Sequence, residues 1–265
     1  MALFDTHVHL SDPPLRDDLP GVLARARQAG VAAFVCPSGD EASSRAARDL
    51  ARAHPGRVFA AAGLHPWAVA PGSSPDLAWL IALLDAGGLV AVGEAGLDAV
   101  VPGADLDAQE RALREQAGLA REAGLPLILH VRGAFDRLVR VLESIGPGGP
   151  GGVLHAFGGS AEVAARLRRL GYVRGVGGGA TRPEAAKVRA AIAATPLDAI
   201  VLETDAPYIG TRTRPKGQVE PADVAEVRDA VATLLGVSPG EVEERTTATA
   251  RALFRTGRLT PPPGS

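Results

Sequence analysis

The chain has 265 residues, of which 46% are hydrophobic and 22% charged, so it can bury a sizeable core and extensive disorder is not expected. Its formal net charge of −2 argues against a protein that coats duplex DNA by bulk electrostatics, because such domains are usually strongly basic. The single cysteine, Cys36, excludes an internal disulfide, and no stretch is long and apolar enough to span a membrane, which favours the cytoplasm.

Short apolar runs recur along the chain, and each is followed by a stretch with helical spacing. The runs predicted as strands are residues 3–10, 31–37, 58–64, 89–94, 126–131, 152–157, 172–176 and 199–203. The stretches predicted as helices between them are residues 19–29, 43–53, 76–86, 107–123, 134–144, 161–170 and 183–193. Eight repeated βα units fit a closed parallel barrel better than an open sheet, so we predict an α/β fold, a single (β/α)₈ TIM-type barrel.

The last part of the chain predicts two more helices, residues 223–235 and 240–254, which we expect to close the barrel. The glycine-rich stretch 146–152 lies between a helix and the next strand, so we interpret it as a loop and not as a linker between domains. The predicted organisation is therefore one hydrolase barrel over residues 1–256 and a flexible tail over residues 257–265.

Histidines gather where barrel enzymes place their active sites. Five of the six fall at the C-terminal end of a predicted strand: His7, His9, His65, His130 and His155. The sixth, His54, lies before Pro55 at a helix end and is interpreted as structural. His7 and His9 are two residues apart on one strand, so their imidazoles share a face and can bind one ion. Asp5 shares that face and is a candidate additional ligand or partner of an imidazole.

Two carboxylates follow strongly apolar runs at the same rim, Glu94 and Asp205. Burying either without a partner would be costly, and a metal ion removes that cost. The neighbouring Glu203 is interpreted as structural, hydrogen-bonded across the barrel mouth. Four imidazoles and two carboxylates exceed the needs of one tetrahedral ion, so we predict two divalent ions bridged by Glu94. The mixed ligands suit Zn, Mn, Co or Ni better than an all-oxygen cage, and Mg stays among the candidates.

The chain resembles the TatD family of metal-dependent deoxyribonucleases, within the amidohydrolase-like barrels, over nearly its whole length. The segments that carry the resemblance are DTHVHL (5–10), GLHP (63–66), GEAGLD (93–98), PLILHVRGAFD (126–136), GVLHAFGGS (152–160), ETDAPY (203–208) and TTATARALF (246–254). The resemblance implies hydrolysis of DNA phosphodiester bonds and metal ligands at His7, His9, Glu94, His130, His155 and Asp205. It also places His65 and Arg132 on the substrate side.

The chain departs from the family pattern at three positions. Ala99 follows the GLD of GEAGLD, where an aromatic residue is usual, and Val219 and Thr249 stand where asparagine is common. The predicted metal ligands are all present, so hydrolysis is still expected. The departures bear on the substrate-facing wall.

We predict that the metal ions activate a water molecule that attacks phosphorus, with Glu94 and Asp205 as the catalytic carboxylates and Asp205 as the proton shuttle. Tyr208 and Phe157 are candidates to stack a base or sugar, or else to pack the rim. Arg132, or a basic loop formed by Arg212, Arg214 and Lys216, is a candidate to hold phosphate oxygens, the alternative for the loop being simple solvation. The expected substrate is DNA, most simply a single-stranded end, bound by a monomer without an obligate protein partner.

Two alternatives remain at this point. The same metal core activates water toward carbon, so the substrate could be a lactone, an amide or an aminoacyl-tRNA ester. Alternatively, the ions could be held by a noncatalytic binding protein.

Overall fold

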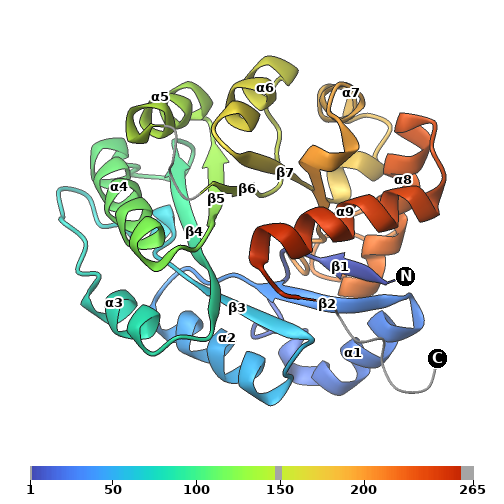
Figure 1. Cartoon of the computed structure of the whole chain (residues 1–265), viewed down its shortest axis with the longest axis horizontal. Coiled ribbons are helices and arrows are strands. Elements are labelled where there is room, and N and C mark those ends of the chain that lie inside the picture. The colour runs from blue at the N-terminus through green and yellow to red at the C-terminus, as the bar shows by residue number, and fades with distance from the viewer. Residues whose placement is uncertain (1, 147–150, 258–265) are drawn as a thin grey trace.

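The predicted strands form one parallel sheet that curls into a barrel, with helices arranged around it (Figure 1). The computed structural model describes residues 2–146 and 151–257. The strands pair in chain order, each parallel to the next. They are β1 (Leu3–Asp5), β2 (Val31–Cys36), β3 (Val58–Ala62), β4 (Leu89–Asp98), β5 (Leu127–Arg132), β6 (Gly152–Leu154), β7 (Tyr172–Val176) and β8 (Ile200–Leu202).

A helix follows each strand, which confirms the predicted (β/α)₈ barrel. These helices are α1 (Leu19–Gln28), α2 (Glu41–Ala53), α3 (Ala78–Asp85), α4 (Leu106–Ala123), α5 (Phe135–Ile145), α6 (Ala161–Arg169), α7 (Ala186–Ala193) and α8 (Val224–Leu235). A further helix, α9 (Pro239–Phe254), packs against β1 and β8 (Figure 1). Each apolar run therefore contains a strand, although the ends differ from those predicted.

Two strands differ from the prediction in a way that matters for function. β1 ends at Asp5, although the backbone beyond it still bonds to both neighbours: Thr6 N–H donates to the carbonyl of Leu202, and Val8 N–H to that of Val35. β4 continues past Glu94 to Asp98, because its pairing with β5 resumes beyond an irregularity between Val92 and Ala95. Glu94 thus lies within a strand at a break in register, where a side chain can be re-aimed.

The barrel interior is filled by side chains and is not a pore. Small and branched residues from successive strands face one another inside: Ala33, Val35, Ala61, Ala91, Ile128, Val153 and Val201. At the end where the strands begin, Phe4 packs against Phe254 of α9, with 6.3 Å between ring centroids. The C-terminal helix therefore closes one end of the barrel, as predicted, and polar side chains collect at the other.

Some predictions fall outside the described residues. These are positions 147–150 of the predicted loop 146–152 and positions 258–265 of the predicted tail. The division into a barrel over residues 1–256 and a tail stays a prediction. No helix in the described ranges is long and apolar enough to cross a membrane.

Candidate metal centre

Four imidazoles meet at the end of the barrel where the strands finish. His7 and His9 follow β1, His130 lies in β5 and His155 follows β6. The rings of His7 and His155 stack with 4.0 Å between centroids, His9 lies 5.2 Å from His7, and His130 lies 5.6 Å from His155. Two stacked imidazoles at such a distance would repel each other if both were protonated, so the arrangement disfavours a second proton on this pair of rings.

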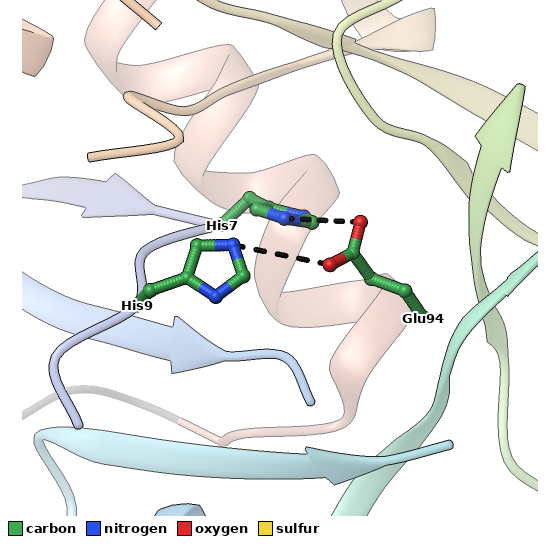
Figure 2. Close-up of side chains that lie close together, drawn as sticks. All are labelled: His7, His9 and Glu94. Carbon is green, nitrogen blue, oxygen red and sulfur yellow. Dashed lines mark ion pairs between the residues drawn. The ribbon is translucent and has the colours of Figure 1, made fainter. Parts of the chain in front are cut away.

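Glu94 and Asp205 lie among these imidazoles. One oxygen of Glu94, Oε2, is 3.5 Å from Nε2 of His7 and 3.4 Å from Nε2 of His155, and the other is 3.8 Å from Nε2 of His9. Figure 2 shows His7 and His9 pointing at the two oxygens of Glu94. Oδ1 of Asp205 is 3.2 Å from Nε2 of His9 and 3.6 Å from Nε2 of His7.

The donor atoms fit divalent ions. Ligand atoms about 2 Å from a tetrahedral ion lie about 3.3 Å from one another, close to the separations above. Ligand atoms lie within 4.8 Å of one another in three groups, which are His7–His9–Glu94, His65–Glu94–His130 and His7–His155–Glu203. Glu94 belongs to two of the groups. Both ring nitrogens of the buried His7 find no hydrogen-bond partner among the described residues, and an ion would supply a partner for one of them.

The charges in the cluster depend on one another. Burial raises the pKa of Glu94, but His7 and His155 outweigh it, so the pKa lies well below its usual value. Burial likewise raises the pKa of Asp205, and the hydrogen bond from His9 lowers it below the usual value. Burial lowers the pKa of His155, yet the adjacent Glu94 raises it to about 10. An ion binding here therefore displaces protons from imidazole.

Asp5 holds the backbone of the site. Its buried carboxyl group, whose pKa burial raises to about 8, accepts hydrogen bonds from the N–H and hydroxyl of Thr204, at 3.0 and 2.6 Å, and from the N–H of His7 at 3.3 Å. Asp205, the residue after Thr204, has a left-handed backbone conformation, with φ of 51°. Its N–H donates to the carbonyl of His7. These contacts favour Asp5 as a support that joins the first strand to the segment after the last, and not as an additional ligand.

Asp98, at the end of β4, is another supporting residue, and its carboxylate contacts three side chains. Its Oδ2 accepts a hydrogen bond from the indole Nε1 of Trp67 at 2.7 Å and lies 3.1 Å from Nε2 of His130. Its Oδ1 lies 3.4 Å from Nε of Arg132, whose side chain is half exposed. Burial raises the pKa of Asp98, but its hydrogen bonds, that of Trp67 first, lower it to about 2. An ionised Asp98 holds the proton of His130 on Nε2 and leaves Nδ1 for an ion.

His65 presents a hydrogen-bond donor to the site. Its Nδ1 accepts a hydrogen bond from the backbone N–H of Trp67 at 3.1 Å, and burial lowers its pKa to about 4. The neutral ring therefore carries its proton on Nε2. Its ring lies 4.5 Å from that of His130. A donor at this place suits a contact to a negatively charged substrate better than ligation of an ion.

A pocket of about 650 Å³ lies over these residues. Its lining includes His9, His65, Trp67, Glu94, Asp205, Tyr208 and Lys216. Two of the lining side chains are exposed aromatic rings, Trp67 at 60% and Tyr208 at 43%. The hydroxyl of Tyr208 donates to Asp12 at 2.7 Å, and its ring meets His9 edge-on. The pocket therefore offers a cavity with polar groups at its floor and aromatic rings at its rim.

Other candidate side chains lie elsewhere. Arg132, Arg212 and Arg214 do not line the pocket, and Arg214 pairs with Asp223 at 3.1 Å. Phe157 is only 3% exposed, and it packs between Phe135 and the guanidinium of Arg174, which corresponds to the packing alternative. His54 caps the C-terminus of α2, in keeping with a structural role.

Comparison with known proteins identifies the family. The family model for TatD related DNases matches residues 4–255. The chain belongs to the TatD family. TatD-family relatives include the uncharacterized metal-dependent hydrolase YabD of Bacillus subtilis, 33% identical over 96% of this chain and 99% of that protein. A protein called 3'-5' ssDNA/RNA exonuclease TatD, from Erwinia billingiae, is 32% identical over 96% of this chain and 99% of its own length.

The crystal structure of the TatD homologue YjjV from Escherichia coli superimposes with a TM-score of 0.88. The two chains are 33% identical in that comparison, which covers 96% of this chain and 98% of the other. Membership in the TatD family makes the chain a metal-dependent hydrolase that acts on ester bonds. The alternative of a noncatalytic binding protein is thereby set aside.

The prediction that the departures from the TatD pattern change the substrate-facing wall was wrong for this pocket. Val219 is fully buried, and the hydroxyl of Thr249 bonds to the carbonyls of Arg245 and Asp198. Ala99 is exposed, and its N–H pairs with the carbonyl of Arg132. None of the three departing residues lines the pocket.

Sequence reasoning assigned no role to Trp67, to Asp98 or to two glutamines of α4. Gln116 bonds both the N–H and the carbonyl of Leu64, at 2.7 and 3.1 Å. Gln109 does the same for Asp98, at 2.8 and 3.2 Å. The sequence did carry a signal for the two glutamines, because they are seven residues apart and fall on the apolar face of a predicted helix, where a polar side chain needs a partner. They fix the backbone on which His65 and the Asp98 carboxylate are mounted.

Proposed function

We propose that this chain is a nuclease that hydrolyses phosphodiester bonds at single-stranded ends of DNA, with two divalent ions bridged by Glu94. The observation that carries the proposal is that one oxygen of Glu94, Oε1, lies 3.8 Å from Nε2 of His9 and the other, Oε2, lies 3.4 Å from Nε2 of His155. A carboxylate has two oxygens and can bind one ion with each. The name of the exonuclease relatives, which refers to single-stranded DNA and RNA, supports the same substrate class.

His7, His9 and Asp205 would hold one ion, and His130 and His155 the other, with Glu94 shared. When bound, divalent ions supply Lewis acidity to a phosphoryl oxygen and acidify water. The nitrogen and oxygen donors suit Zn, Mn, Co or Ni, with Mg still a candidate. The number and identity of the ions belong to the proposal.

The chain's own residues divide the remaining work. Asp205 is ionised at neutral pH, since its pKa lies below the usual value, so it can accept a proton from the attacking water. His65 is neutral and can donate its Nε2–H to a phosphate oxygen. Lys216 lines the same pocket and can add a positive charge, and Tyr208 can contact a sugar or base. Arg132 stays a predicted substrate contact, placed on the far side of Asp98.

A direct test uses protein freed of ions by a chelator and reloaded with Mn, Mg, Zn, Co or Ni. The substrates are end-labelled single-stranded DNA and RNA, duplex DNA, a phosphomonoester, a lactone, an amide and aminoacyl-tRNA. We expect stepwise release of nucleotides from single strands, abolished in Glu94→Gln and retained in the control Glu115→Gln, an exposed residue of α4. Metal analysis should find two ions per chain.

Hydrolysis of carbonyl compounds alone would reject the nuclease and support one of the other substrate classes. One ion per chain in an active enzyme would reject the bridged pair. The monomeric state and the cytoplasmic location stay predictions.

A further inference from the structure

We propose that Trp67 is the platform on which an unpaired nucleobase stacks beside the bond to be cleaved. This inference rests on the proposed nuclease function and names the part of the substrate that the pocket recognises. A base stacked on Trp67 would fix its neighbouring phosphate over the metal centre.

The indole of Trp67 is exposed to solvent. Trp67 is 60% exposed, although an indole has more to gain from burial than almost any other side chain. It lies within the short helical turn that begins after His65, and it lines the same pocket as Glu94 and Asp205. An exposed ring at the rim of a polar pocket is a recognition feature, because it offers a large contact area to a flat ligand.

Trp67 is held in place by hydrogen bonds of its side chain and its backbone. The indole Nε1–H donates to the buried Asp98 at 2.7 Å, and the backbone N–H donates to Nδ1 of His65 at 3.1 Å. The indole also meets the imidazole of His65 edge-on, with 4.7 Å between centroids. A ring held at both backbone and side chain loses little conformational entropy when a ligand binds, so the exposed surface is preorganised.

Trp67 is held at a defined position relative to the candidate metal centre. The oxygen of Asp98 that accepts the indole N–H is the same oxygen that lies 3.1 Å from Nε2 of His130. One carboxylate oxygen therefore sets the position of the platform relative to a candidate metal ligand. His65, beside the indole, offers a hydrogen bond to the phosphate that follows the stacked base.

Stacking selects the form of the nucleic acid. A base within a duplex has both faces covered, so only an unpaired base can lie on the indole. Stacking tolerates every base, since each has a flat aromatic face. The pocket is therefore expected to take single-stranded ends with little sequence preference.

The test distinguishes recognition of the base from recognition of the sugar–phosphate backbone. In a Trp79→Phe background, Trp67 is the one remaining tryptophan of the two in the chain and its fluorescence reports directly on the platform. Chelator-treated protein is titrated with a single-stranded oligonucleotide and with an abasic sugar–phosphate chain of equal length. Steady-state cleavage of both is then measured with ions restored, in Trp67→Ala, Trp67→Phe and the Trp79→Phe control.

We expect quenching by the oligonucleotide and little by the abasic chain. Trp67→Ala should raise KM for the oligonucleotide about fivefold or more and leave KM for the abasic chain unchanged, whereas kcat should fall on both chains because the bond to Asp98 is lost. Trp67→Phe keeps a ring but loses the bond to Asp98, so it should lower kcat more than it raises KM. A thermal melt for each variant distinguishes these effects from loss of the fold.

An equal rise in KM for both chains, or cleavage of the oligonucleotide without quenching, would overturn the stacking role and leave the proposed nuclease function intact. If the unsubstituted enzyme cleaves and binds neither chain, the nuclease and the platform fall together.

Discussion

At the scale of single residues, the centre is built so that protons and metal ions compete for the same atoms. His155 lies 3.4 Å from Glu94 on one side and 3.6 Å from Glu203 on the other. Burial alone would keep this imidazole neutral, but the two carboxylates stabilise its charged form when no ion is present. In the ion-free protein, His155 is therefore protonated and forms a buried ion pair with Glu94. The proton occupies the position that a metal ion would take.

This competition predicts how the stability of the ion-free protein depends on pH. The folded pKa of His155, about 10, lies above its ordinary value of 6.5. The stabilisation is therefore complete below pH 6.5 and is lost as the pH rises through about 10. Thermal melts in chelator should show a Tm that falls between pH 7 and 10.5, with a flatter profile in His155→Gln. Parallel profiles for the two proteins would contradict this assignment.

At the scale of elements, helix α4 supports the rim of the barrel through two amide side chains. Gln116 and Gln109 each close a pair of hydrogen bonds on a single residue near the end of a neighbouring strand. The rim is irregular at these points, so its backbone groups find no partners in the sheet. Amide side chains from a helix provide both a donor and an acceptor at the required spacing.

Replacing Gln116 by methionine should test this support, since the side chains have similar volume but methionine offers no comparable hydrogen bonds. The N–H and carbonyl of Leu64 would lose their partners, and we expect a loss of about 1–3 kcal/mol in the free energy of unfolding. KM should also rise, because Leu64 precedes His65. Denaturant titration measures the first effect, with the exposed neighbour change Glu115→Ala as the control. Equal stability of Gln116→Met and the unsubstituted protein would reject the role.

Element boundaries mark the limit of what the sequence could predict. Strands buried on both faces leave continuous apolar runs, so all eight were found, and the βα rhythm then places their ends on one rim. That geometry is enough to bring His7, Glu94 and Asp205 together. The contacts of Asp98 with Trp67 and His130 could not be predicted in the same way, because they depend on the continuation of β4 past Glu94 and on side-chain conformations, which an apolar run does not reveal.

At the scale of the whole molecule, the barrel is joined where its first and last strands meet. Thr6 bonds to the carbonyl of Leu202 through both its N–H and its hydroxyl, and Asp5 bonds to Thr204. The candidate ligands come from segments at β1, β4, β5, β6 and β8, so ions bound by them would connect strands around the whole barrel.

Removal of ions should therefore lower the stability of the entire fold. Ions at a hundred times their dissociation constant add about 2.7 kcal/mol per site, which corresponds to roughly 5 °C or more in Tm for a chain of this size. We expect the Tm to fall by this amount in chelator and to recover when Zn or Mn is restored. His54→Gln should show the same shift, because His54 lies at the C-terminus of α2, outside the pocket. A melt insensitive to chelator, with metal loss verified, would argue against the ligand set.

The seam between Asp5 and Thr204 also has a consequence for the order of events during synthesis. The first two imidazoles leave the ribosome some two hundred residues before Asp205 and the threonine beside it. No nascent fragment that stops short of the eighth strand can assemble the full coordination shell. Completion of the proposed ligand set is therefore a late step of maturation, because it waits for Asp205.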